Sequence, residues 1–134
     1  MIKLLPLIRE SKLVPLRQQQ RKDANIERTN KIIQDYIDGG SKGNLDLRNT
    51  PITSLPQDLK VGGWLHLMDT PITSLPPNLK VEGWLDLGGT PITSLPQDLK
   101  VGSSLNLMDT PLSKTHTEEQ IKQMCPGIKG KIYL

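Results

Sequence analysis

The chain has 134 residues and a net charge of +3; it contains no Phe, two Trp and two Tyr, but eleven Pro and eleven Gly. This length favours one domain with a real core, and the scarcity of aromatic residues indicates a core of Leu, Ile and Val. A lone cysteine excludes an intramolecular disulfide, and no apolar run is long enough for a signal-peptide core or a membrane span. We therefore expect a soluble cytoplasmic protein.

The first 22 residues are expected to form a basic tail. Residues 1–31 contain eight Lys or Arg and three acidic residues, whereas residues 45–113 contain four and seven. Two similar pieces, KLLPLIR and KLVPLRQ, begin at Lys3 and Lys12, and their apolar side chains would be exposed unless they contact something. The sequence leaves open whether they dock on the rest of the chain or on a partner. The candidate docking residues are Leu4, Leu5, Leu7, Leu13, Val14 and Leu16.

The positive charge of this tail also raises a nucleic-acid-binding interpretation. Its phosphate contacts would come from Lys12, Arg17, Arg21 and Lys22. Binding of that kind would weaken steeply as the salt concentration rises. We favour the simpler interpretation, which is a solvated charged segment.

Residues 23–44 are predicted to form an N-terminal helical cap. Asp23 or Asn25 can begin a helix there, and the pair Gly39-Gly40 can end it. Because repeat proteins need covered ends, we expect the helix to lie over the first unit of the repeat region that follows. Three isoleucines share one side of this helix: Ile26, Ile33 and Ile37.

The region 45–113 repeats with a period of twenty residues. Its shared pattern is LxLxxTPIxSLPxxLxVxx, which indicates a solenoid, since chance does not produce three nearly identical copies. The fourth unit is truncated. The units are 45–64, 65–84, 85–104 and 105–113.

A single unit shows how its chain would close into one coil. Alternating apolar or small residues from Leu59 to Leu67 indicate an extended chain with one side turned inward. Pro71 and Pro76 then exclude a regular helix on the return side. Each unit supplies about six inward aliphatic side chains, worth roughly 1.5–3 kcal/mol each when buried. Stacking the units in parallel would join them into one core.

Threonine occupies the same turn in all four units, which predicts a stacked ladder. We expect its hydroxyl groups to bond backbone groups in the turns of neighbouring coils. An ice-binding array is the alternative, but the next threonine is three residues away and a proline intervenes. The ladder residues are Thr50, Thr70, Thr90 and Thr110.

The unit LDLRNTPITSLPQDLKVGGW resembles a leucine-rich repeat of the short bacterial kind, with Thr where many members have Asn. Bacterial and phage proteins with ITSLP repeats are similar to it. The resemblance covers residues 45–113, about half of the chain. It implies a right-handed leucine-rich-repeat solenoid, an α/β fold rich in β-structure, in which we expect about five parallel strands and a helical cap at each end. It also implies a binding scaffold, without naming a ligand.

Residues 114–134 are predicted to form the C-terminal cap. The stretch from Thr117 to Gln120 fits a capping box, and a short helix would run through Met124. The final residues Ile132-Tyr133-Leu134 repeat the L-x-L pattern and predict a fifth strand. His116, just before the helix, is expected to be exposed.

Cys125 follows the predicted C-terminal helix and raises a catalytic interpretation. Some bacterial leucine-rich-repeat effectors are cysteine-dependent ubiquitin ligases, so the resemblance brings that activity to mind. Their catalytic domain has no room in this chain, and no paired base is evident. We therefore expect Cys125 to be a small buried apolar residue.

Alternation sends the residues between the inward leucines to the opposite face of the sheet. In a leucine-rich repeat this is the concave, ligand-facing side, and Trp, Met, Tyr and Arg are enriched where binding energy concentrates. The alternative is that both indoles merely cover their neighbours or lie under the tail. The candidate binding residues are Trp64, Trp84, His66, Asp86, Met68, Met108, Asp46, Arg48, Asn106 and Tyr133.

His66 lies between Asp46 and Asp86 in this arrangement, which raises a proton-transfer or metal-binding interpretation. Side chains in one column of a parallel sheet project side by side and do not converge, so we favour a cross-strand charge pair. No catalytic residue, metal or cofactor is predicted.

A non-catalytic protein-binding scaffold is the function that these patterns favour, in a bacterial or phage-infected cell. The partner is either another protein or a second copy of the chain, and no membrane contact is expected. The alternative is a structural component of a phage particle or another assembly, with residues 1–22 as the assembly arm.

Overall fold

The structure is a computed structural model that describes the backbone of residues 16–134 and the side chains of residues 23–134. The candidate docking residues Leu4, Leu5, Leu7, Leu13 and Val14 therefore lie outside the described residues, as does the side chain of Leu16. The elements in chain order are α2 (Leu16–Asp38), β1 (Leu45–Asp46), β2 (Lys60–Val61), β3 (Leu65–His66), β4 (Lys80–Val81), β5 (Leu85–Asp86), β6 (Lys100–Val101), β7 (Leu105–Asn106), α3 (Pro111–Thr115), α4 (Glu118–Met124) and β8 (Ile132–Tyr133).

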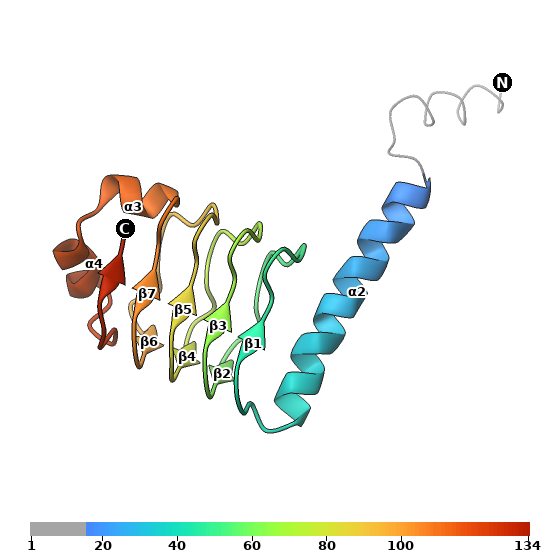
Figure 1. Cartoon of the computed structure of the whole chain (residues 1–134), viewed down its shortest axis with the longest axis horizontal. Helices are drawn as coiled ribbons and strands as arrows, with labels where there is room; N and C mark the ends of the chain where they lie inside the picture. Colours follow the sequence, from blue (N-terminus) through green and yellow to red (C-terminus); the bar gives the residue numbers. More distant parts are fainter. Residues whose placement is uncertain (1–15) are drawn as a thin grey trace, which may run out of the picture.

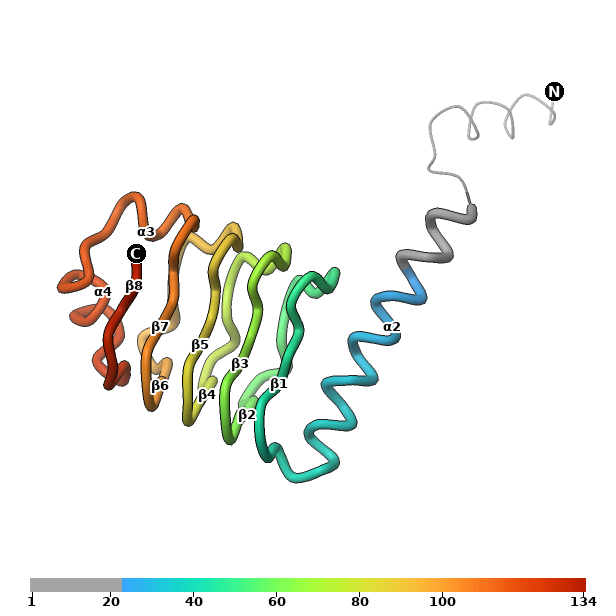
Figure 2. The backbone as a smooth tube through the Cα atoms, in the orientation of Figure 1, coloured from blue at the N-terminus to red at the C-terminus, as the bar shows by residue number. Residues whose placement is uncertain are grey.

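The fold is a parallel β-solenoid with helices at both ends (Figure 1). One sheet has five strands in the order β1-β3-β5-β7-β8, and the other has three in the order β2-β4-β6. The tube in Figure 2 shows the coils stacked side by side along the molecule. The predicted β-rich solenoid is confirmed, and so is the final strand, because β8 pairs with β7.

The described part of the chain has eight strands, where we expected about five. The stretch from Leu59 to Leu67 is not one continuous strand, because it bends at Gly62-Gly63 and gives one strand on each side of a corner. Side-chain alternation continues through the bend, so the sequence pattern did not reveal it. Each of the three complete coils therefore contributes one strand to each of the two sheets.

Register in both sheets follows the twenty-residue period. Leu45 pairs with Leu65, Leu65 with Leu85, and Leu85 with Leu105. Ile132 takes the next place beside Leu105. Equivalent positions of successive units therefore form columns across the sheet, with neighbouring strands about 4.8 Å apart.

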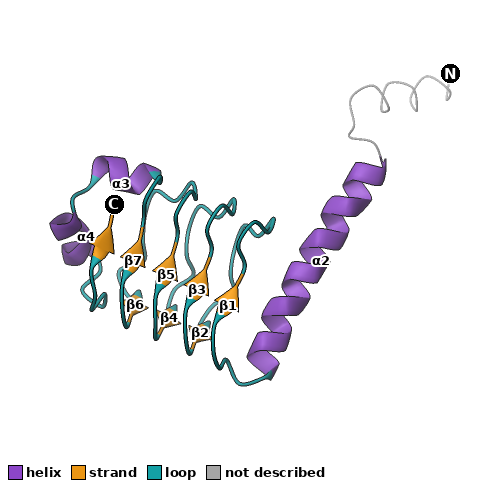
Figure 3. Cartoon of the chain, in the orientation of Figure 1, coloured by secondary structure: helices purple, strands orange, loops and turns teal. Residues whose placement is uncertain are grey.

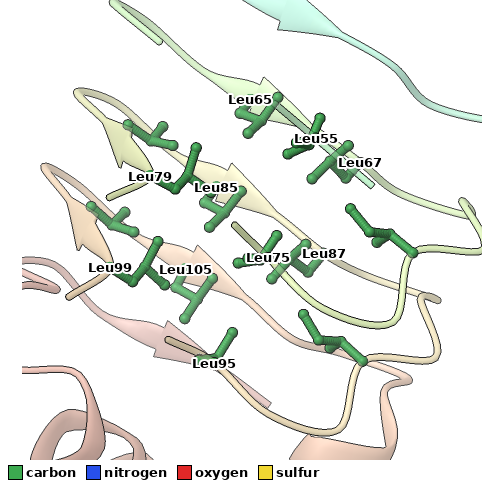
Figure 4. Close-up of a cluster of buried hydrophobic side chains, with 14 of the residues drawn as sticks. Leu55, Leu65, Leu67, Leu75, Leu79, Leu85, Leu87, Leu95, Leu99 and Leu105 are labelled. Carbon is green, nitrogen blue, oxygen red and sulfur yellow. The ribbon is translucent and has the colours of Figure 1, made fainter. Parts of the chain in front are cut away.

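The core is a continuous stack of aliphatic side chains between the two sheets and the return segments (Figure 4). In the second unit all six inward residues have no more than 8% of their surface exposed. This confirms the predicted inward set, and no single coil could bury it alone. The six residues are Leu65, Leu67, Ile72, Leu75, Leu79 and Val81.

Helix α2 begins at Leu16 and not at Asp23 or Asn25 as expected. The residues between Leu16 and Asp23 are Arg, Gln and Lys, which are strong helix formers. The helix therefore includes them and begins before the capping residues that the sequence offers. Figures 1 and 3 show that the C-terminal end of α2 lies near the first coil and that its N-terminal end lies away from the stacked coils. Within the described part of the chain, no helix is both long and apolar enough to cross a membrane.

Only the C-terminal half of α2 covers the first coil. Ile33 is buried, and Tyr36 and Ile37 pack against the core. Ile26 lies on the same side and lines a hollow with Pro51 and Ile52 of the first coil, but it remains exposed and does not pack against the core. The Tyr36 hydroxyl donates to the Gly43 carbonyl at 2.7 Å and accepts from the backbone N–H of Gly62, at the bend between β2 and β3, at 3.0 Å.

Two short helices close the other end of the solenoid. The capping box of α4 is present as predicted, with reciprocal bonds between Thr117 and Gln120. Helix α3 was not predicted; Thr110 is its N-cap and Pro111 its first residue, where a missing N–H has no cost. The fourth unit can turn helical here because it lacks the second proline of the other units. His116 is half-buried at the end of α3, not exposed.

Cys125 is fully buried under this end, as expected. Its thiol donates to the Pro96 carbonyl at 3.2 Å. Burial raises the pKa of the Cys125 thiol, whereas reactive cysteines have a lowered pKa and some exposure. These are the properties of a structural cysteine.

The threonine ladder is buried, as predicted for a structural role, except that Thr50 in the first coil is only half-buried. Each hydroxyl donates to the carbonyl three residues earlier in its own coil, for example Thr70 to Leu67 at 2.8 Å and Thr90 to Leu87 at 2.7 Å. The expected bonds to neighbouring coils were wrong, because the turn brings its own carbonyl nearer. The ladder closes each turn individually.

Thr90→Val is expected to lower the free energy of unfolding by about 0.5–1.5 kcal/mol, because the shape is kept while one buried hydrogen bond is lost. Urea denaturation followed by circular dichroism would measure this. Thr93→Val, at an exposed threonine of the same coil, is the matched control and should change stability by less than about 0.5 kcal/mol. Equal losses in the two variants would contradict a role for the buried hydroxyl.

Candidate binding face

The outward side of the five-stranded sheet, here called the outer face, carries the ten predicted binding residues. Three large apolar side chains among them are exposed, with Met108 at 49%, Trp64 at 44% and Trp84 at 38%. Asp46 and Arg48 are exposed beside the first strand, and the other five are half-buried. The structure therefore brings all ten to one face, as the alternation predicted.

Four aromatic side chains make contact along this face and are here called the aromatic row: Trp64, Trp84, Tyr133 and His66. The two indoles are stacked, with ring centroids 5.3 Å apart and an angle of 18° between their planes. Tyr133 lies 6.2 Å from Trp84, tilted by 32°. His66 meets Trp64 edge-on at 5.7 Å. The row thus spans strands from β3 to β8.

Glycine in the next coil makes room for the first indole. A Cβ atom added to Gly83 would lie 2.5 Å from Cδ1 of Trp64, so this indole reaches across the coil that follows its own. The backbone N–H of Trp64 is held by the side-chain carbonyl of Asn44 at 2.7 Å. The first indole therefore does cover its neighbour, yet about two fifths of Trp64 and of Trp84 remains exposed.

Lys131 belongs to the same face and was missed by the sequence analysis. The pairing of Leu105 with Ile132 places Lys131 beside Ser104, in the column that contains both tryptophans. Its Nζ atom lies 5.3 Å from the ring centroid of Tyr133, within cation–π range. The sequence contained the signal for Lys131, because aligning the predicted fifth strand with the repeats places this residue in the same column as the two tryptophans.

The carboxylate and amide groups of the neighbouring column close the turns after the strands. Asp86 accepts from the backbone N–H of Gly88 and from the Asn106 side chain, both at 3.0 Å. Asn106 in turn accepts from the backbone N–H of Met108 at 3.0 Å. A side chain bonded to the backbone two residues later is a known turn-forming arrangement. These residues therefore have a structural role that the sequence analysis did not assign.

Asp46 makes the same turn contact and also a two-point ion pair. Its carboxylate accepts from Nε and Nη2 of Arg48 at 2.9 and 2.7 Å. The hydrogen-bonded Arg48 guanidinium holds the pKa of the Asp46 carboxyl below its ordinary value. The Arg48 side chain is thus paired within its own coil, and the net charge at this end of the outer face is close to zero.

His66 stands between Asp46 and Asp86 in the column but does not converge with them on a common point. Among residues 23–134, no three His, Cys, Asp or Glu side chains are grouped so that they could hold a metal ion. The strand register places His66 beside Asp46 and Asp86, as expected for a parallel sheet. The expected charge pair is not formed in the described part of the chain, because Asp46 pairs with Arg48 and Asp86 bonds Gly88 and Asn106.

Comparisons of the chain with protein-family models, with curated proteins and with solved structures find no match. The function is therefore inferred from the geometry of the outer face.

Proposed function

We propose that this protein is a non-catalytic scaffold that binds a protein partner on the outer face of its five-stranded sheet. The observation that carries the proposal is the stacked and exposed pair Trp64 and Trp84. Large exposed aromatic side chains beside Met and Tyr are typical of the centre of protein interfaces. The resemblance of the repeat to those of bacterial and phage proteins favours a partner inside a bacterial cell.

The fold itself does not require tryptophan at these positions. The same column holds Asn44 in the first coil, Ser104 in the fourth and Lys131 in the final strand. The inward leucines supply the core without the indoles, since each is almost completely buried. A solvent-exposed pair of indoles is therefore better explained by a surface that becomes covered.

Binding would bury the aromatic row against an apolar area of the partner. Loss of water from the exposed indole surface supplies the main driving force. The charged groups at the two ends of the face, the Asp46–Arg48 pair and Lys131, would fix the orientation of the partner more than its affinity.

The test is affinity capture from a lysate of the cells that make the protein, comparing wild type with Trp64→Ala/Trp84→Ala. A captured partner should be lost with the double variant, and the purified pair should bind at least about 30-fold more weakly, as expected when two central aromatic residues each cost 1 kcal/mol or more. Lys60→Ala/Lys100→Ala, on the other sheet, is the control and should bind normally.

Circular dichroism must show the same fold for both variants. Identical sets of captured proteins for wild type and the tryptophan variant would refute binding through the outer face. If the partner were lost with the lysine variant and retained with the tryptophan variant, the binding surface would be on the three-stranded sheet.

A further inference from the structure

A hollow of about 250 Å³ lies at the turns that follow β3, β5 and β7. Met68 and Met108 form two of its walls, and Gly88, Gly89 and Asn106 lie between them. We call this hollow the methionine socket. It exists because the third coil has glycine where the second and fourth coils have methionine.

Gly88 is not required by the fold. Its φ angle is not in the left-handed region, and the equivalent residues of the other coils are Arg48, Met68 and Met108. A Cβ atom at this position would meet only side-chain ends, at 3.2–3.5 Å, including Cε of Met68. The backbone conformation therefore does not require glycine at this position. The absence of a side chain there leaves space between the two methionines.

Acidic residues flank the socket at the turn that follows each strand. Asp69, Gly89 and Asp109 all have φ angles between +57° and +68°, as does Asn49 in the first coil. This conformation favours Gly, Asn and Asp. Since Asn49 shows that an uncharged residue suffices, the negative charges of Asp69 and Asp109 are not demanded by the turn. Gly89 adds no side chain between them.

We propose that the methionine socket binds a lysine or arginine side chain of the protein partner. The aliphatic stem would lie between the two thioethers, which are polarizable and adapt to irregular shapes. The cationic group would lie near the carboxylates of Asp69 and Asp109. This inference rests on the proposed function and adds the chemistry of one partner residue.

The charge distribution of the outer face supports a cationic occupant. Arg48 is already paired with Asp46, and Lys131 lies over Tyr133 in the last strand. The socket is therefore the part of the face where acidic groups and apolar walls occur together.

Methionine methyl NMR tests the socket directly on the full chain. The protein has four methionines, so a sample with ¹³C-labelled methionine methyl groups gives few signals, and Met68 and Met108 report on the socket. The probe is the capped tripeptide acetyl-Gly-Lys-Gly-amide, and the control is the same peptide with norleucine. We expect the Met68 and Met108 signals to shift with the lysine peptide, while Met124, packed against the core, stays in place.

Two variants separate the charge from the space. Asp69→Asn/Asp109→Asn keeps the turn, as Asn49 does, and should weaken lysine-peptide binding about fivefold. Gly88→Met fills the socket with the residue that the neighbouring coils have and should abolish the shifts at Met68 and Met108. Equal shifts with lysine and norleucine peptides, or no shifts at peptide concentrations of about 10 mM, would overturn the proposal.

The same variants distinguish failure of this inference from failure of the proposed function. Capture that is lost with Trp64→Ala/Trp84→Ala but unchanged with Gly88→Met would leave the proposed function standing and overturn the role of the socket. Peptide shifts that vanish in Gly88→Met, together with unchanged capture by the tryptophan variant, would support the socket and refute the aromatic row as the binding centre.

Discussion

Leu85→Ala is expected to lower the free energy of unfolding by about 2–5 kcal/mol, the range for a large-to-small change in a packed core. Leu85 is completely buried in the middle coil, with Leu65 and Leu105 as its neighbours in the column. Coils on both sides fix the cavity left by the change, so it cannot close easily. Urea denaturation followed by circular dichroism and by tryptophan fluorescence would measure the loss.

Leu134→Ala is the matched control, because the substitution is the same but Leu134 is exposed at the end of the chain. It should change stability by less than about 0.5 kcal/mol. A Leu85→Ala variant as stable as the control would show that the stacked coils are not held together by their aliphatic core.

Gly102→Ala is expected to lower the free energy of unfolding by about 1–3 kcal/mol, the usual cost of forcing extra atoms into a packed region. The corner at Gly102 approaches the preceding coil so closely that an added Cβ would overlap the carbonyl oxygen of Glu82 and lie 2.9 Å from its carbonyl carbon. Backbone atoms cannot move aside by changing rotamer, so the spacing between the two coils must open. Thermal and urea denaturation would both report it.

Gly88→Ala provides the control for the change from glycine to alanine. There the new methyl group meets side-chain ends at 3.2–3.5 Å and no backbone atom of another coil. We expect a loss smaller than that at Gly102, of no more than about 1 kcal/mol. If both variants lost the same stability, the cost at Gly102 would come from the unfolded chain, where alanine and glycine also differ, and the close approach of the coils would not matter.

The repeat period carried most of the information about the fold. Because identical units must stack in register, the twenty-residue spacing predicted the columns, the parallel pairing and the inward leucines. The bend at Gly62-Gly63 was not predictable from alternation, since the pattern of apolar residues continues across it. Helix α3 was missed because the proline of each turn was taken to exclude a helix. In the fourth unit Pro111 can begin a helix, since the second proline of the other units is missing there.

The outer face could be predicted in direction but not in detail. Alternation placed Trp64 and Trp84 outward, yet the contact of Trp64 with the coil of Gly83 depends on an indole rotamer. The turn-closing roles of Asp86 and Asn106 depend on the backbone path after the strand, which no residue pattern specified. The methionine socket arises from the difference between one coil and its neighbours, so it becomes visible only when the coils are stacked.

The register of the columns has a consequence for how such a protein can change in length. Each coil meets its neighbours through the same pairing, so a whole unit can be added or removed without rebuilding either cap. The outer face would then grow or shrink in steps of one strand spacing, about 4.8 Å. Duplicating the third unit would place two glycine-bearing coils side by side and widen the gap between the two methionines, whereas deleting the second unit would remove one indole. A lineage could adjust the length of the outer face by unequal exchange between repeats, while the caps at the two ends stay unchanged.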